Sequence, residues 1–214
     1  MATHRETITL YPSAFVSGSY SSITNQNNPV GKGSNSTSYV NAYIRTGNSA
    51  ASNLVYAFDC SSIPAEARIT SVTCTAKAYI SNTQSNRIAT RNIQLYSGTT
   101  AKGSAHAIST STTAFSITCG TWTREELDSC LIRIDIVRGT NNTTTNYYVR
   151  FYGATLTISY EWDDAPSPVS SRALLKVGGT WKEGKVYKKI SGRWVEQDAS
   201  ESVFTEKIYI VLDA

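Results

Sequence analysis

Short runs of alternating apolar and polar residues fill residues 6–162, the first three-quarters of the chain. In the run "LIRIDIVR", at residues 131–138, isoleucines occupy every second position and charged side chains lie between them. Successive side chains of a β-strand point to opposite faces, so this period of two indicates half-buried strands. Similar runs, separated by polar turns, are "TITLYPS", "YVNAYIRT", "NLVYAFDC", "RITSVTCTAKAYI", "RNIQLYS", "AFSIT" and "YYVRFYGATLTISYEW". Many short strands without helices between them predict an antiparallel all-β sandwich or barrel.

A change of the apolar face marks the last of these runs. Val149 and Phe151 occupy odd-numbered positions, whereas Leu156 and Ile158 occupy even-numbered ones. A one-residue shift moves every following side chain to the other face of the sheet, and a β-bulge absorbs such a shift. We therefore expect a bulge near Tyr152-Gly153.

One short helix and one long loop are also predicted. The sequence Thr123-Arg124-Glu125-Glu126 matches a capping box, in which the threonine hydroxyl accepts from the amide of Glu126 and the Glu126 side chain reaches back to the cap. This helix should end by about Cys130 and close one end of the sandwich core. The longest irregular stretch, Ser22 to Ser38, is rich in asparagine, glycine and serine, and we expect a surface loop there that carries contacts.

The chain is predicted to hold a β domain at residues 1–163, a linker at 164–171 and a small β module at 172–214. The linker lies within "DDAPSPVSS", and the module contains the strand-like runs "ALLKV", "TWKEGKVYKKI", "RWVEQ" and "KIYIVL". Turns at residues 178–179 and 191–192 would join these strands as hairpins. Because aromatic side chains bury the most area, we expect them to form the core of this module. An exposed tryptophan pair that stacks on a sugar is the alternative. The expected core residues are Trp181, Tyr187, Trp194, Phe204 and Tyr209.

Charge sets limits on the partners. Charged residues make up 17% of the chain, and its net charge of +4 is spread along it without a dense basic run. Binding to nucleic acid needs clustered cations that neutralise phosphates, so we expect no nucleic-acid partner. No stretch approaches the roughly 20 apolar residues that cross a bilayer, and the start "MATHRETITLYPS" lacks the apolar segment of a secretory signal. We expect synthesis in the cytoplasm and no membrane insertion.

The sequence offers little for catalysis or metal binding. Its cysteines form no C-x-x-C pair and have no nearby histidine, which favours buried free thiols over a zinc site. A disulfide stays open if the mature particle lies outside the cell. His4 and His106 lie outside any catalytic-triad pattern, and Asp59, before a Ser-Ser-Ile-Pro turn, is explained by an Asx turn. We predict no catalytic residue, no metal site and no cofactor. The four cysteines are Cys60, Cys74, Cys119 and Cys130.

Aromatic side chains remain as candidates for binding. Rings stack on sugars and are enriched where subunits pack, while asparagine and serine in the loops supply hydrogen bonds. Burial in the core is the competing interpretation for any single ring. The candidate contacts with a surface glycan or a neighbouring subunit are Trp122, Tyr147, Tyr148 and Tyr152.

Two stretches resemble known families. The stretch "LVYAFDCSSIPAEARITSVTCTAKAYI" resembles the strand–turn–strand signature of DNRLRE-type jelly-roll adhesive domains, although Cys60 and Cys74 stand where leucine or a similar residue is usual. The stretch "LLKVGGTWKEGKVYKKISGRWVE" is similar to short Gly-x-Trp hairpin modules at the ends of tailed-bacteriophage structural proteins. These resemblances imply a jelly roll in a virion protein and transfer no catalytic residue. The matching positions of the first signature are Phe58, Asp59, Ser61, Ser62, Ile63, Pro64, Ile69, Thr70 and Ser71.

A virion structural protein is the function that these expectations favour, with a tail-fibre or tail-tip component of a tailed bacteriophage first. Its partners would be other virion proteins, further copies of the chain in a trimer or higher homo-oligomer, and a host-surface glycan. Weak sites bind firmly when several are displayed together. A capsid decoration protein or head fibre, a stand-alone carbohydrate-binding module and a hydrolase are the alternatives.

Overall fold

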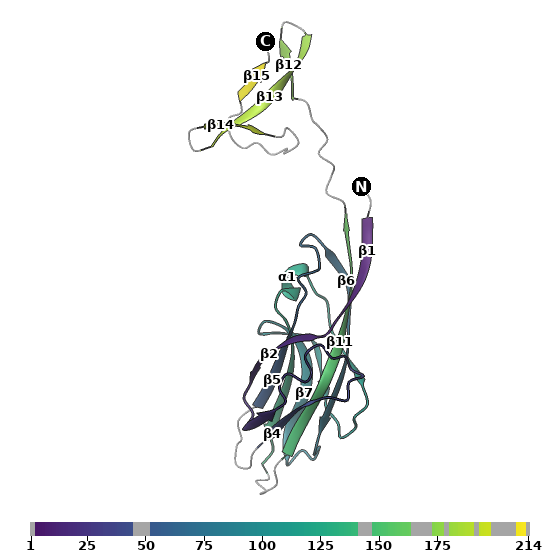
Figure 1. Cartoon of the computed structure of the whole chain (residues 1–214). Coiled ribbons are helices and arrows are strands. Elements are labelled where there is room, and N and C mark those ends of the chain that lie inside the picture. The colour runs from purple at the N-terminus through teal and green to yellow at the C-terminus, as the bar shows by residue number, and fades with distance from the viewer. Residues whose placement is uncertain are drawn as a thin grey trace. The chain divides into compact units, whose positions relative to one another are not determined.

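The chain divides into two compact units, of which the first is Thr3–Asp163 (Figure 1). The computed structural model describes residues 3–44, 52–140 and 147–163 with their side chains, and the backbone of 173–177, 180–190, 193–197 and 209–212. The strands of the first unit are β1 (Thr3–Leu10), β2 (Pro12–Gly18), β3 (Ser22–Thr24), β4 (Val40–Ile44), β5 (Ser52–Phe58), β6 (Arg68–Ile80), β7 (Ile88–Ser97), β8 (Thr100–Ala107), β9 (Phe115–Ile117), β10 (Cys130–Arg138) and β11 (Tyr147–Asp163).

These strands form two antiparallel sheets with the connectivity of a jelly roll. A six-stranded sheet has the order β3-β4-β11-β6-β9, with β1 also paired to β11, and a five-stranded sheet has the order β2-β5-β10-β7-β8. From β4 onward, successive strands cross between the sheets at every step except the β7–β8 hairpin, which is the pattern of a double-sheet jelly roll. The predicted all-β jelly-roll sandwich is confirmed.

The core lies between the inner faces of the two sheets. In β10 every second residue, from Cys130 to Arg138, is buried, and β11 shows the same alternation on its inner side. Both strands have hydrogen-bonded neighbours on each side, so their inner side chains lose nearly all contact with water. Leu54, Ile134 and Phe151 are among the fully buried residues. The period of two in the sequence therefore maps directly onto the core.

The predicted bulge is confirmed in β11. Its register with β6 shifts between Phe151 and Gly153, so that Phe151 pairs with Ala78 and Gly153 with Lys77. Gly153 has φ 144°, a conformation that side chains with a Cβ rarely adopt. The bulge keeps apolar residues inside on both of its flanks, because it absorbs the change in parity.

The prediction of one irregular surface loop from Ser22 to Ser38 is wrong. Ser22–Thr24 forms the edge strand β3, and the rest packs onto the sandwich. The Tyr56 hydroxyl donates to the carbonyl of Gln26 at 2.7 Å, and the Gly31 amide donates to the carbonyl of Pro12 at 2.7 Å. The loop is held because these backbone groups find their partners in the sandwich.

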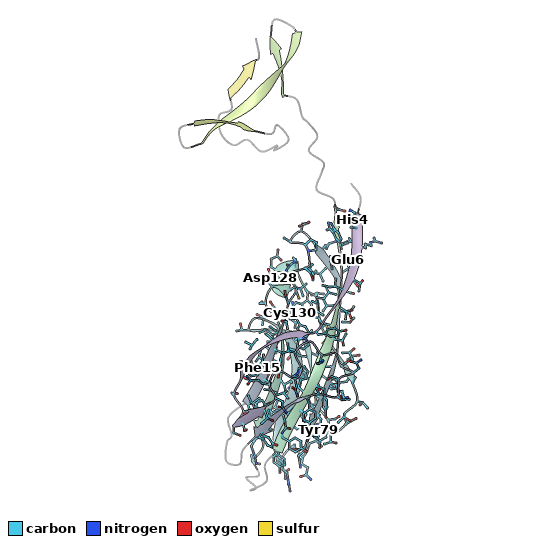
Figure 2. All side chains as sticks on the ribbon, in the orientation of Figure 1. His4, Glu6, Phe15, Tyr79, Asp128 and Cys130 are labelled. Atoms are coloured by element: carbon cyan, nitrogen blue, oxygen red, sulfur yellow. The ribbon has the colours of Figure 1, made fainter. Side chains whose placement is uncertain are left out.

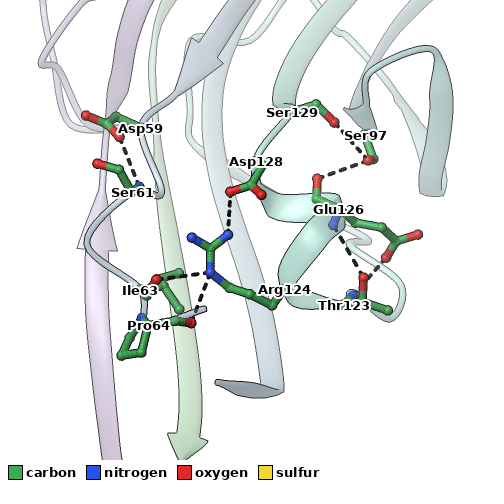
Figure 3. Close-up of polar contacts among 10 residues, drawn as sticks. All are labelled: Asp59, Ser61, Ile63, Pro64, Ser97, Thr123, Arg124, Glu126, Asp128 and Ser129. Carbon is green, nitrogen blue, oxygen red and sulfur yellow. Dashed lines mark hydrogen bonds and ion pairs between the residues drawn. The ribbon is translucent and has the colours of Figure 1, made fainter. Parts of the chain in front are cut away.

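The predicted capping box is confirmed in the helix α1 (Arg124–Leu127) (Figure 3). The Thr123 hydroxyl accepts from the Glu126 amide at 3.3 Å, and the Glu126 carboxylate accepts from the Thr123 amide at 2.8 Å. Arg124 Nε donates to the carbonyls of Ile63 and Pro64, at 3.0 and 3.1 Å, so the helix is tied to the Ser-Ser-Ile-Pro turn. Leu127 is fully buried, and α1 therefore closes part of the core.

The expected Asx turn is also present at the start of this segment. The Asp59 carboxylate accepts from the Ser61 amide at 3.0 Å (Figure 3). Hydrogen bonds from Ser61 hold the pKa of Asp59 below its ordinary value. Asp59 thus has a local structural role in the turn.

Acid is expected to weaken the α1 end of the sandwich through Glu126. The hydrogen bond from Lys102 and the one from the Thr123 amide lower the pKa of Glu126 below its ordinary value of 4.5. A lowered pKa means stability that is present above the unfolded value and lost as pH falls through the folded value. Urea unfolding of the parent chain should give a lower free energy of unfolding at about pH 2.5 than at about pH 6. The decrease should be smaller in Glu126→Gln, which lacks the titrating carboxylate. Equal losses in both proteins would contradict this role.

The second unit contains a four-stranded antiparallel sheet of β12 (Ala173–Val177), β13 (Thr180–Ile190), β14 (Arg193–Gln197) and β15 (Tyr209–Leu212). The order is β12-β13-β14, with β15 paired to β13, and the predicted strands of the small β module are thereby confirmed. The hairpin turns at 178–179 and 191–192 lie outside the described residues, as does Phe204. The proposed module core falls on residues whose side chains are not described, and only backbone register places them. The pairs are Trp181 with Lys176, Tyr187 with Tyr209, and Trp194 with Lys189.

Candidate functional site

The outer surface of the six-stranded sheet carries a group of tyrosines at one end. They lie on β4, β6 and β11 and on the residue just before β4, on the sides of these strands that face away from the core. Figure 2 shows Tyr79 at the end of the sandwich opposite His4 and Glu6. We call this group, together with the polar residues between the rings, the tyrosine face. Its members are Tyr39, Asn41, Tyr43, Lys77, Tyr79, Tyr148, Arg150 and Tyr152.

Cross-strand register brings the rings together. Tyr148 on β11 pairs with Tyr43 on β4, and Arg150 pairs with Tyr79 on β6. The ring centroid of Tyr148 lies 6.1 Å from that of Tyr43 and 5.9 Å from that of Tyr79. Side chains at paired or diagonal positions on adjacent strands are close enough for aromatic contact. A continuous strip of rings therefore crosses β4, β11 and β6.

Arg150 lies among these rings. Its guanidinium carbon is 4.5 Å from the ring centroid of Tyr39 and 4.8 Å from that of Tyr148, which is cation–π geometry. Its Nε donates to Asn41 Oδ1 at 3.4 Å. Among the described residues, Arg150 has no carboxylate partner within ion-pair distance. The rings hold the cation in place without neutralising its charge.

A second cation borders the strip. The Lys77 Nζ lies 4.7 Å from the ring centroid of Tyr152 and donates to the carbonyl of Ser36 at 2.9 Å. Tyr152 also packs against Tyr39, with ring centroids 5.1 Å apart. Burial, followed by the contact with the Tyr148 hydroxyl, raises the pKa of Tyr79. The tyrosine face therefore combines aromatic rings with two basic side chains, Lys77 and Arg150.

Two rows of hydroxyl side chains continue this outer surface toward the other end of the sheet. They come from β1, β11 and β6, and their members are exposed or half-buried. The amide of Ser34 donates to Thr155 Oγ1 at 3.2 Å, so the 25–38 loop lies between these rows and the tyrosine face. We call them the hydroxyl rows. Register aligns them as Thr9–Thr157–Thr73 and Thr7–Ser159–Ser71.

A polar groove of about 420 Å³ lies at the end of β1 and β11 away from the tyrosine face. Glu161 there accepts from Arg5 Nε at 3.2 Å and is also paired with Arg68. The Tyr160 hydroxyl donates to Glu6 Oε2 at 2.8 Å, and burial with this contact raises the pKa of Tyr160 to about 12. Glu161 is thus paired with two guanidinium groups. The two carboxylates of the groove, Glu6 and Glu161, therefore already have partners within the protein.

No family model, curated protein or solved structure matches this chain.

Two further findings concern the part of the chain that the structure describes. Its histidines, cysteines and acidic residues form no group of three or more that could hold a metal ion. None of its helices has the length and apolar character needed to span a membrane.

Three of the four predicted contact rings lie inside the protein. Trp122 is 6% exposed, donates its indole N–H to the carbonyl of Cys119 at 2.8 Å, and lies near α1 rather than with the tyrosines. Tyr147 is 2% exposed because it falls on the inner side of β11. Tyr152 is 6% exposed because Tyr39 and Lys77 cover its ring, so it is a buried member of the tyrosine face. Only Tyr148 among the four offers part of its surface to a ligand.

Several residues of the tyrosine face were not predicted as contacts. Tyr43 is 37% exposed, and Tyr39, Tyr79 and Arg150 are half-buried. Alternation in "YVNAYI" already separates Tyr39 and Tyr43 from the apolar positions. Their convergence with Arg150 depends on the pairing of β4 and β6 with β11, for which the sequence holds no direct signal.

The cysteines are buried and free, as predicted. Burial raises the pKa of Cys74, and it raises that of Cys119 to about 11. A thiol reacts as its thiolate, so both groups are unreactive near neutral pH. They act as small apolar core residues.

Proposed function

We propose that this chain is a non-catalytic structural protein of a tailed-bacteriophage virion, most simply a tail-fibre or tail-tip component. Its sandwich contacts other virion proteins or the host surface through the tyrosine face. The observation that carries the proposal is the strip of rings around Arg150 on a sheet surface that is otherwise polar. The Ser-Ser-Ile-Pro signature and the Gly-x-Trp repeat, with their resemblance to proteins of such particles, support the virion assignment.

Tyrosine suits a contact surface for physical reasons. Its ring adds apolar contact area, its hydroxyl stays hydrogen-bonded to water or a ligand, and it loses little conformational entropy on binding. Here the rings are further restrained by one another and by Arg150, so less freedom remains to be lost. Display on a trimer or higher homo-oligomer would add avidity to each weak contact.

A stand-alone carbohydrate-binding module is a second candidate, and the hydroxyl rows favour it. The rings offer stacking, and the hydroxyl groups farther along the same sheet surface offer hydrogen bonds to sugars. The two candidates share the binding surface and differ in where the protein resides. Antibodies against the chain should label the tails of isolated particles if the first candidate holds. Label on heads would favour a decoration protein, and no label would favour the stand-alone module.

Removal of the Tyr148 ring should weaken binding. In the full chain, Tyr148→Ala is expected to reduce affinity for a bacterial surface polysaccharide by about tenfold, because one aromatic contact contributes roughly 1–1.5 kcal/mol. Fluorescently labelled protein on a printed array of bacterial capsular and wall polysaccharides provides the measurement.

Tyr11→Ala is the matched control for this experiment. Tyr11 is 44% exposed and lies outside the tyrosine face, so its removal should leave affinity unchanged. Thermal unfolding of both variants should match the parent chain. Unchanged binding by a folded Tyr148→Ala protein, or the absence of binding to every polysaccharide, would refute surface binding by this face.

A further inference from the structure

Charge is distributed unevenly over the first unit. The carboxylates of the groove and of α1 lie toward the end of the unit away from the tyrosine face, and Figure 2 shows Glu6 and Asp128 well separated from Tyr79. Most of them have partners there, such as Arg5 and Arg68 for Glu161, or Lys102 for Glu126. The tyrosine face itself contains Lys77 and Arg150 but no carboxylate.

The chain segments beside the tyrosine face repeat this bias. Strands β4 and the 72–80 part of β6 contain no aspartate or glutamate, nor does the 147–155 part of β11. The positive charge of Arg150 is therefore not balanced by nearby sequence.

The donors of Arg150 are also largely unused. A guanidinium carries five N–H groups, and its Nε contacts Asn41 Oδ1 at 3.4 Å. The Arg150 side chain donates no other hydrogen bond to the described residues. The rings of Tyr39 and Tyr148 contact the guanidinium and restrain it, so the remaining donors lie near their place before any ligand arrives. A carboxylate can accept two parallel hydrogen bonds from such a group.

We infer that the tyrosine face binds an acidic polysaccharide, with a uronate-type carboxylate at Arg150 and a sugar ring stacked on Tyr148. This inference rests on the proposed function and specifies its ligand. Stacking and charge are supplied by adjacent residues, since Arg150 and Tyr148 are two positions apart on one side of β11. Farther along the sheet, beyond the 25–38 loop, the hydroxyl rows supply partners for neutral sugar hydroxyls.

The spacing of charges favours a polysaccharide over a nucleic acid. Single-stranded nucleic acids carry a phosphate at every nucleotide, and the proteins that bind them line a groove with many cations. The tyrosine face has two cations, and one of them, Lys77, is already hydrogen-bonded to the carbonyl of Ser36. A uronate polymer needs only one of its carboxylates at Arg150 and can stack and hydrogen-bond through the rest of each sugar, so a face with two cations suffices for it.

The test uses the full chain and three immobilised probes: polygalacturonate, neutral dextran and oligothymidylate. Biolayer interferometry should show binding to polygalacturonate that weakens with added salt, and little binding to dextran. Arg150→Gln is expected to lower affinity for polygalacturonate by at least about tenfold, as loss of a charge-assisted pair implies. Lys77→Gln, a second variant, should lower it less.

Arg5→Gln is the matched control, because it removes the same charge from an exposed arginine beside the groove. It should bind polygalacturonate within about twofold of the parent chain, as expected for a screened, distant charge. Thermal unfolding shows that each variant is folded. Should Arg150→Gln fail to fold, an unchanged affinity of folded Lys77→Gln at low salt would count against the inference.

Each remaining outcome is decisive. Equal binding of dextran and polygalacturonate, or Arg150-independent binding, overturns the acidic ligand but leaves surface binding intact. Stronger, Arg150-dependent binding of oligothymidylate overturns it in favour of a nucleic acid. Failure to bind polygalacturonate, together with Tyr148-dependent binding to a neutral polysaccharide on the array, refutes this inference alone. Failure to bind any polysaccharide refutes this inference and host-surface binding by the tyrosine face, whereas absence of antibody label on isolated particles refutes the virion assignment.

Discussion

Gly153→Ala is expected to destabilise the sandwich by roughly 3–5 kcal/mol, from backbone strain and steric overlap together. Gly153 has φ 144°, where a residue with a Cβ is strained. A Cβ at this position would lie 2.3 Å from the carbonyl oxygen of Lys32 and 2.9 Å from that of Gly33. These are backbone atoms of the 25–38 loop, so no side-chain rotation relieves the overlap. Urea unfolding followed by tryptophan fluorescence measures the loss.

Gly31→Ala separates the two causes. Gly31 also has a positive φ, of 69°, but a Cβ there would meet no atom within 4 Å. Its loss should be limited to about 1–2 kcal/mol, the cost of a left-handed backbone for alanine. The difference between the two variants sets an upper limit on the contribution of the contact between the bulge and the loop, because φ 144° is itself less accessible to alanine than φ 69°. Equal losses would show that the loop moves aside, and that Gly153 is needed only for its backbone conformation.

Phe151→Ala is the second change with a large expected effect, a loss of about 3–5 kcal/mol. The Phe151 ring is fully buried, and its centroid lies 5.2 Å from that of Tyr56 on the facing sheet. Truncation would remove apolar burial and leave a cavity between two central strands, which can collapse only in part. Thermal and urea unfolding of the full chain provide the measurement.

Phe115→Ala is the matched control, because it makes the same chemical change at a partly buried position on the edge strand β9. The edge can relax toward solvent, so its loss should be clearly smaller than that of Phe151→Ala. Phe151 also separates Arg150 from Tyr152, which belong to the tyrosine face. Loss of the Phe151 ring should loosen this part of β11. At temperatures just below its unfolding transition, Phe151→Ala should therefore bind polysaccharide more weakly than the parent chain does. A loss no larger than in Phe115→Ala would contradict the assignment of this ring to the central core.

Local rules accounted for the parts of the fold that were predicted correctly. The isoleucines of β10 and the parity change in β11 express the geometry of a strand, in which adjacent side chains alternate whatever the partner strands are. The capping box of Thr123 and Glu126 depends on four consecutive residues alone. β3 was missed because three residues give too short a pattern, and pairing with β4 decides their conformation.

The prediction of the candidate site succeeded less well. Residue type alone suggested Trp122 and Tyr147 as contacts, but an aromatic ring is equally favourable in a core. Parity would have separated Tyr147 from Tyr148, since Val149 and Phe151 define the inner side of β11. Tyr152 lies on the outer side and is buried by Tyr39 and Lys77, which no pattern within β11 reveals.

The amino-acid sequence by itself determined the strand periods, the bulge, the capped helix and the apolar positions of the core, because each depends on neighbours within a few residues. Tertiary structure alone decided that Tyr43, Tyr79 and Arg150 meet on one surface, since they are brought together by pairing across β4, β11 and β6. It also decided which charges are balanced. Arg5 meets Glu161 because β1 pairs with the end of β11, whereas Arg150 lies among rings where the fold brings no carboxylate of the described residues within reach.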